Sequence, residues 1–175
     1  MATVSAARTA ALVGYYNAPM LLFAKLPGAP AALSHATSRE LVVCMGEQWH
    51  RFPSSFYLPG PHYRLGFVKT AFDGMLPLAF NASAGGTAFA PAELNDRNQE
   101  VAQQYVRDAA STCAFWVGLH AEAPPAGARW SLVAEVPFLD APRSPALWRA
   151  FRVPVLSARR NAFTAMRLLR NDGRP

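Results

Sequence analysis

The sequence predicts an α+β fold, in which a small, mostly antiparallel or mixed sheet of about five or six strands carries one main helix. Short apolar runs of strand length recur along the chain, and one longer segment, residues 92–109, has a helical pattern. The 175 residues include 15 prolines and 11 glycines, which favour short elements joined by loops. A chain of this length is the size of a single domain.

A short helix, interpreted as the remnant of a longer one, is expected to precede this domain. Small and apolar side chains at residues 3–13 predict a helix that stops at Gly14, because glycine is a natural left-handed terminator. Residues 15–20 then place aromatic side chains beside a turn, as is typical where a chain leaves a membrane interface. Residues 21–37, rich in proline and glycine, are interpreted as a linker.

The strands are predicted from compact apolar runs. Residues 40–45 form the most compact run, which ends at Gly46 and is expected to be buried on both faces. Residues 61–70 alternate apolar and polar side chains, which favours a half-buried strand. The remaining predicted strands are residues 113–119, 130–138, 151–156 and 163–169.

The main helix is expected at residues 92–109. Pro91 stands at its start, and Glu93 and Asp96 fall in its first turns, where the helix dipole favours acids. Its apolar side chains recur at roughly helical spacing. Residues 72–91 before it are a loop rich in glycine, alanine and proline.

The densest local pattern is the segment 46–59, Gly-Glu-Gln-Trp-His-Arg-Phe-Pro-Ser-Ser-Phe-Tyr-Leu-Pro. Its two prolines exclude a regular helix, while four aromatic and several ionisable side chains gather in a few residues. A second charged feature lies near the end of the chain, where residues 143–174 hold eight arginines and one acid, Asp172. Such a segment is either a solvated arginine face or a contact for an anionic surface. Nucleic acid is not expected as a partner, because no recognition motif accompanies the charge.

Motifs for independent catalysis are missing from the sequence. The 11 acids are scattered, and there is no DxD, HxxxH or CxxC pattern and no glycine-rich phosphate loop, so neither a metal site nor a cofactor is expected. Cys44 and Cys113 each lie in an apolar run, and two buried thiols are as good an interpretation as a disulfide. Asn81 begins an Asn-Ala-Ser glycosylation pattern in the glycine-rich loop.

Residues 43–56, which include most of the dense segment, resemble the mannosyltransferases of lipid-linked oligosaccharide assembly that use dolichyl-phosphate-mannose. Within that family the resemblance is to the α-1,2-mannosyltransferase. Shorter motifs follow in the same order at residues 64–67, 94–100 and 137–141, and the spacing holds over about residues 12–170.

This resemblance implies a C-terminal, lumenal part of a glycosyltransferase of the GT-C type in the endoplasmic reticulum membrane. Residues 1–20 correspond to the end of a transmembrane helix and its lumenal exit, residues 21–37 to a linker, and residues 38–175 to a lumenal domain. The family's catalytic acid lies on a first lumenal loop that has no counterpart here. We therefore expect a chain that is inactive alone. Its expected partners are the membrane body of the parent enzyme, the membrane surface, and, through the parent, dolichyl-phosphate-mannose and the lipid-linked oligosaccharide.

The residues expected to face substrate or the membrane body are Trp49, Arg51, Phe52, Ser54 and Ser55. Trp49 would stack on a sugar face, and Arg51 would pair with phosphate. The alternative is that both rings belong to the core and that Arg51 binds a loop carbonyl or a carboxylate.

Asp140 and Arg143 are a second candidate contact for the acceptor glycan, or else form a turn in which Asp140 binds backbone amides. The lumenal setting implied by the resemblance allows glycosylation of Asn81 and oxidation of the cysteines at 44 and 113. Two other functions stay open: a free-standing binding or scaffold domain, and a fragment of a glycolipid-anchor mannosyltransferase.

Overall fold

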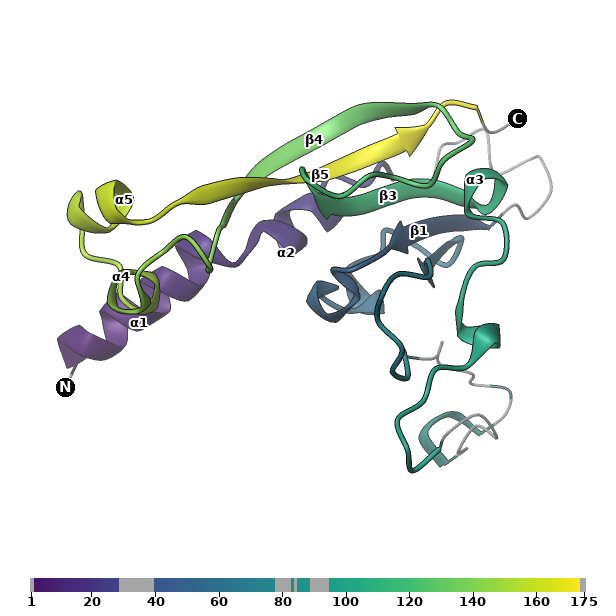
Figure 1. Ribbon diagram of the computed structural model, residues 1–175, viewed down its shortest axis with the longest axis horizontal. Helices are drawn as coiled ribbons and strands as arrows, with labels where there is room; N and C mark the ends of the chain where they lie inside the picture. Colours follow the sequence, from purple (N-terminus) through teal and green to yellow (C-terminus); the bar gives the residue numbers. More distant parts are fainter. Residues whose placement is uncertain (1, 29–39, 78–82, 84, 89–94, 174–175) are drawn as a thin grey trace.

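The computed structural model describes residues 2–28, 40–77, 83, 85–88 and 95–173, and within them one sheet has five strands in the order β2-β1-β3-β5-β4 (Figure 1). The strands are β1 (Leu41–Met45), β2 (Tyr63–Phe67), β3 (Cys113–Leu119), β4 (Trp130–Leu139) and β5 (Phe163–Asn171). The helices are α1 (Ala2–Tyr15), α2 (Ala18–Phe23), α3 (Ala109–Thr112), α4 (Ala146–Ala150) and α5 (Leu156–Arg160). Short 3₁₀ turns occupy Trp49–Arg51, Ser55–Tyr57, Gly86–Ala88 and Ala102–Gln104.

The sheet is mixed, which confirms the predicted α+β class. β1 pairs in parallel with both β2 and β3, whereas β5 pairs antiparallel with β3 and β4. Parallel strands are covered on both faces, and accordingly four of the five residues of β1 are buried. The compact apolar run at residues 40–45 thus forms an interior strand, and its expected burial on both faces is confirmed.

Each face of the sheet has its own apolar cluster. Val43, Met45 and Val117 pack with Leu22 and Phe23 of α2 on one face. The other face carries a smaller cluster made of Val42, Cys44, Cys113, Trp116 and Leu169.

α1 is the longest helix in the described part of the chain, and it lies beside α4 at the end of the molecule away from β1 (Figure 1). The expected stop at Gly14 is wrong by one residue, because the helix continues to Tyr15. A Cβ atom at Gly14 would lie 2.7 Å from Nη1 of Arg152, so this glycine allows a close approach and does not end the helix. No helix among the described residues is long and apolar enough to cross a membrane.

The helix predicted at residues 92–109 is wrong over its described part, residues 95–108. Asn98 has a positive φ of 51°, and Val106 donates its backbone N–H to the carbonyl of Phe67 instead of to a helical partner. The segment runs along the edge of β2, where Tyr105 forms a parallel bridge to Phe67. Packing of the half-buried Tyr105 and Val106 at the sheet edge outweighs a helical propensity already weakened by Asn95 and Asn98.

The strand predicted at residues 151–156 is also wrong. Pro154 has no N–H for a sheet, and Val155 adopts a positive φ of 63° in a three-residue turn, closed by a 2.7 Å bond from Leu156 N–H to the Pro154 carbonyl. The buried Ser157 hydroxyl holds this turn by donating to the Phe151 carbonyl and accepting from Val153 N–H. Residues 163–169 do form a strand, β5, which extends to Asn171.

Candidate functional site

The carboxyl ends of three parallel strands meet at one edge of the sheet. Residues 46–48 follow β1, residues 68–70 follow β2, and residues 121–122 come shortly after β3. An open cavity of about 560 Å³ lies among them, and we call it the strand-end cavity. Its lining includes Glu47, Gln48, Lys69, Thr70, Trp116 and Glu122. The crevice outside the carboxyl ends of parallel strands is the usual ligand position in open α/β sheets.

Gln48 connects this cavity to the dense segment that the sequence singles out. Its Nε2 donates to Glu122 Oε1 over 2.5 Å, and its Oε1 accepts from Arg51 Nε over 2.6 Å. Gln48 is only 8% exposed, so the amide is held with both ends in use. The three side chains therefore form a hydrogen-bonded chain in a partly buried environment.

Burial decides the electrostatics of this chain. It raises the pKa of Glu122, against the opposing effects of the hydrogen bond from Gln48 and the charge of Arg51. Burial also lowers the pKa of Arg51, which nearby Tyr16 and Glu122 partly offset. A carboxyl whose pKa is raised in a cleft is a typical feature of functional sites, and structural ion networks produce the same feature.

Two aromatic side chains of the dense segment, Trp49 and Phe52, lie against the core. Trp49 packs on Phe72 with ring centroids 4.6 Å apart, and Phe52 meets Phe67 edge-on at 6.2 Å. Arg51 stacks its guanidinium 4.7 Å from the ring centroid of Phe138. Both rings thus pack on the core while staying half-buried, and Arg51 binds the side-chain amide of Gln48.

Ser54 and Ser55 lie at the tip of the segment, where Ser54 is half-buried. Ser54 Oγ accepts from the backbone N–H of Phe56 over 3.2 Å and so caps the 3₁₀ turn at Ser55–Tyr57. Ser55 is exposed, and Phe56 beside it is 94% exposed. The tip therefore offers an apolar ring and two hydroxyls to whatever lies beyond it.

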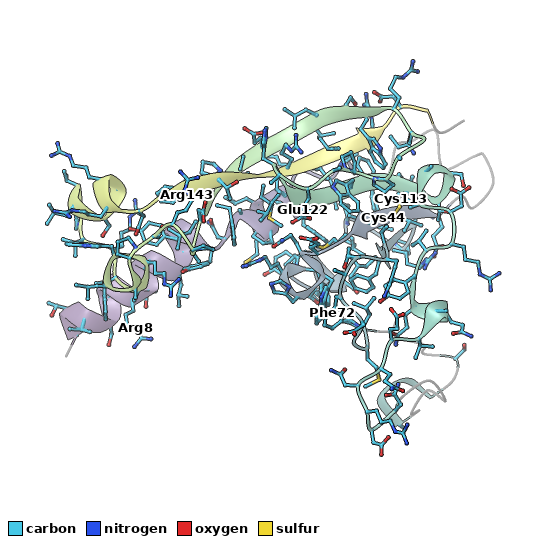
Figure 2. All side chains as sticks on the ribbon, in the orientation of Figure 1. Arg8, Cys44, Phe72, Cys113, Glu122 and Arg143 are labelled. Carbon is cyan, nitrogen blue, oxygen red and sulfur yellow. A yellow bond between two sulfur atoms is a disulfide. The ribbon has the colours of Figure 1, made fainter. Side chains whose placement is uncertain are left out.

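Asp140 and Arg143 form a turn at a different place. Asp140 Oδ1 accepts from Arg143 N–H over 3.3 Å, and the two side chains pair at 3.4 Å. Figure 2 shows Arg143 on the part of the molecule that carries α1 and α4, whereas Glu122 lies near the end of β3. The structure therefore does not place this pair at the strand-end cavity.

The remaining predicted sites are the cysteines and the glycosylation acceptor. The structure joins Cys44 and Cys113 in a disulfide, with 5.7 Å between their Cα atoms (Figure 2). Asn81 lies outside the described residues. No group of three or more side chains that could hold a metal ion occurs in the part of the chain that the structure describes.

Local sequence pattern does not mark Lys69, Thr70, Trp116 and Glu122, which all line the cavity. Lys69 and Thr70 close the predicted run 61–70, Glu122 follows the predicted run 113–119, and Trp116 lies within that second run. Parallel pairing of those strands was the signal that would have placed them together, because it brings their carboxyl ends to one edge.

Comparison with known proteins finds similarity over most of the chain to curated proteins named α-1,2-mannosyltransferase ALG9. The Arabidopsis thaliana protein is 33% identical over 164 residues, which cover 91% of this chain and 28% of that protein. The Homo sapiens protein is 36% identical over 88% of this chain and 26% of its own length. The Saccharomyces cerevisiae protein is 31% identical over 84% of this chain and 28% of its own length.

The match thus spans only between a quarter and a third of the length of the curated relatives. No family model matches the chain, and no solved structure matches it.

Proposed function

The similarity supports membership in the family of α-1,2-mannosyltransferases named ALG9, and we propose that this chain is the C-terminal, lumenal part of such an enzyme. The observation that supports this proposal most strongly is the match to seven curated relatives. It covers 81–98% of this chain and part of each relative. The complete enzyme takes mannose from dolichyl-phosphate-mannose and transfers it to the lipid-linked oligosaccharide of protein N-glycosylation. Its catalytic acid lies outside this chain, which contributes no catalytic residue.

A lumenal location in the endoplasmic reticulum is supported by the disulfide. Cys44 and Cys113 are fully buried and bonded to each other. Disulfides form and persist in oxidising compartments such as the lumen of the endoplasmic reticulum and are rare in the cytosol.

A contact with the membrane body and membrane surface is supported by the end of the molecule that holds α1, α4 and α5 (Figure 1). Apolar side chains are exposed there: Val4, Leu12, Val13, Leu147, Val155 and Leu156. Exposed arginines accompany them at positions 143, 152, 159 and 160. Apolar side chains among cations suit the boundary between lipid tails and anionic headgroups.

The dense segment is assigned to the acceptor side of the enzyme. Trp49, Arg51 and Phe52 give it a rigid base, because each is anchored on an aromatic side chain or on Gln48. Ser54, Ser55 and the exposed ring of Phe56 form its outer tip. A rigid base with an exposed polar and aromatic tip suits contact with a glycan or with the membrane body.

A chimeric enzyme tests the proposal. The matching region of the Saccharomyces cerevisiae relative is replaced by this chain, and the addition of α-1,2-linked mannose to lipid-linked oligosaccharide is measured in membranes. We expect the chimera to transfer mannose, and the relative with the region deleted to transfer none. A chimera present in membranes at the normal level, with its disulfide formed but without transfer, would refute the proposal.

Orientation is tested on the same chimera through Asn81. A mass decrease on endoglycosidase treatment that is absent from the Asn81→Gln variant would indicate a lumenal domain. Labelling of this domain by a membrane-impermeant reagent applied from the cytosolic side would contradict that orientation.

A further inference from the structure

Two polar atoms at the strand-end cavity have no hydrogen-bond partner among the described residues. They are the indole Nε1 of Trp116 and Oε2 of Glu122, and both atoms are buried. Trp116 as a whole is 4% exposed, and both residues line the cavity. Leaving a buried polar atom without a partner destabilises a fold, so two such atoms at one cavity call for an explanation.

Gly118 keeps the space between these two atoms free of side chain. A Cβ atom at that position would lie 2.8 Å from Trp116 Nε1 and 3.0 Å from Glu122 Oε2. The donor and the acceptor therefore flank the same point on the surface of β3. The other carboxylate oxygen, Oε1, already accepts from Gln48, which holds Glu122 in place.

Trp116 Nε1 and Glu122 Oε2 together favour a ligand group that accepts one hydrogen bond and donates another. An indole N–H can only donate, and an ionised carboxylate can only accept. A hydroxyl does both at once, accepting from Nε1 and donating to Oε2. An anion would be repelled by Glu122, and the ammonium of the nearby Lys69 is already paired with Glu100.

We propose that the strand-end cavity binds a saccharide, one hydroxyl of which bridges Trp116 Nε1 and Glu122 Oε2. Leu119 and Pro125 supply apolar wall, and Thr70 and Glu47 supply further polar groups around the cavity. Apolar surface with a few placed polar groups is the usual composition of a small-ligand site. The choice of a mannose-containing saccharide rests on the proposed function, whereas the need for a group that both accepts and donates rests on the two unpartnered atoms.

Nuclear magnetic resonance of the indole N–H groups tests the proposal on the full 175-residue chain with its disulfide intact. The chain has four tryptophans, whose resonances are assigned with single Trp→Phe variants. α-1,2-mannobiose is added to about 10 mM, because a site with few hydrogen bonds corresponds to a Kd on the order of 1 mM. Glycerol at equal concentration serves as a hydroxyl-bearing compound that is not a sugar.

We expect mannobiose, but not glycerol, to shift the Trp116 resonance, and Glu122→Gln to weaken binding at least tenfold. Glu135→Gln on β4 and Trp148→Phe on α4 are the matched controls and should keep wild-type affinity. Folding of each variant is checked by the dispersion of the remaining resonances. No shift with mannobiose, an equal shift with glycerol, or unchanged affinity in Glu122→Gln would overturn the proposal.

The two proposals fail in different ways. An active chimera together with an unshifted Trp116 resonance would reject the saccharide site alone. A specific shift together with an inactive chimera would reject the mannosyltransferase assignment and keep the saccharide site.

Discussion

At the scale of single residues, Gln48 is the side chain on which the candidate site depends. One end of its amide accepts from Arg51, and the other donates to Glu122. Arg51 in turn stacks on Phe138, a residue of β4 in the main core. The dense segment, the strand-end cavity and the core are therefore joined through one buried amide.

Arg51 contributes through both its hydrogen bond and its stacking. Arg51→Met keeps aliphatic packing on Phe138 and loses the bond to Gln48, so we expect a loss of about 1 kcal/mol in the free energy of unfolding. Arg51→Ala loses the packing as well, for about 2 kcal/mol in total. Urea unfolding measures both. In the chimera, normal mannose transfer by Arg51→Ala at a normal protein level would remove the acceptor-side role.

Glu122 gives the stability of the chain a specific pH dependence. Its pKa is raised above the ordinary 4.5 by burial, so the folded chain binds this proton more tightly than the unfolded chain does. The resulting stabilisation is fully present below pH 4.5 and is lost as pH rises through the folded pKa. Arg51 and Glu47 are the charges that modulate it.

Urea unfolding between about pH 4 and pH 8 compares the wild type with Glu122→Gln. We expect the wild type to lose stability relative to the variant as pH rises, because only the wild type ionises at this position. If the free energy of unfolding of the wild type stays constant relative to that of the variant, or increases relative to it as pH rises, burial does not govern the pKa of this carboxyl.

At the scale of elements, the close packing of β2 against β1 requires a glycine. Gly66 lies opposite Cys44 in the parallel register, and a Cβ atom there would lie 2.6 Å from Val42 Cγ1 and 2.7 Å from Val106 Cγ2. Both of these neighbours are β-branched and cannot swing aside easily. The parallel pair that carries two sides of the strand-end cavity thus depends on the missing side chain.

Gly66→Ala is expected to lower the free energy of unfolding by about 1–3 kcal/mol, because the extra methyl overpacks a filled space. Gly60→Ala is the matched control, since nothing lies within 4 Å of a Cβ atom at Gly60. Chemical denaturation of both variants measures the difference. Equal stability of the two would mean that β1 and β2 separate at little cost.

At the scale of the whole molecule, the disulfide connects two neighbouring interior strands of the sheet. Cys44 in β1 and Cys113 in β3 are 69 positions apart in the sequence. A bond of this span restricts the unfolded chain strongly, and losing it typically costs about 2–5 kcal/mol. Because both sulfurs are buried, a reductant reaches them only when the chain opens.

The Cys44→Ala, Cys113→Ala double variant is therefore expected to unfold about 2–5 kcal/mol more easily than the oxidised wild type. The wild type should resist a reductant under native conditions and be reduced once denaturant unfolds it. Thiol labelling after incubation with the reductant measures this. Rapid reduction of the folded chain would contradict the buried position of the bond.

Local pattern was enough to predict most of the sheet. The run at residues 113–119 coincides with β3, and those at 40–45, 61–70, 130–138 and 163–169 overlap the other four strands, because each is a short apolar stretch bounded by turn residues. The same composition predicted the α+β class. The resemblance carried by residues 43–56 led to the family that the comparisons support.

Only the tertiary structure decided which strands run parallel, and with that the place of the candidate site. Residues 95–108 became an edge segment because Tyr105 and Val106 bond to and pack against the end of β2, a contact that no local window contains. Glu122 is one of 11 scattered acids in the sequence. It joins Gln48 and Trp116 at a cavity because β1 and β3, distant in the chain, end at the same edge of the sheet. Propensity acts over a few residues, whereas burial and strand pairing act across the whole chain, and here they placed the site.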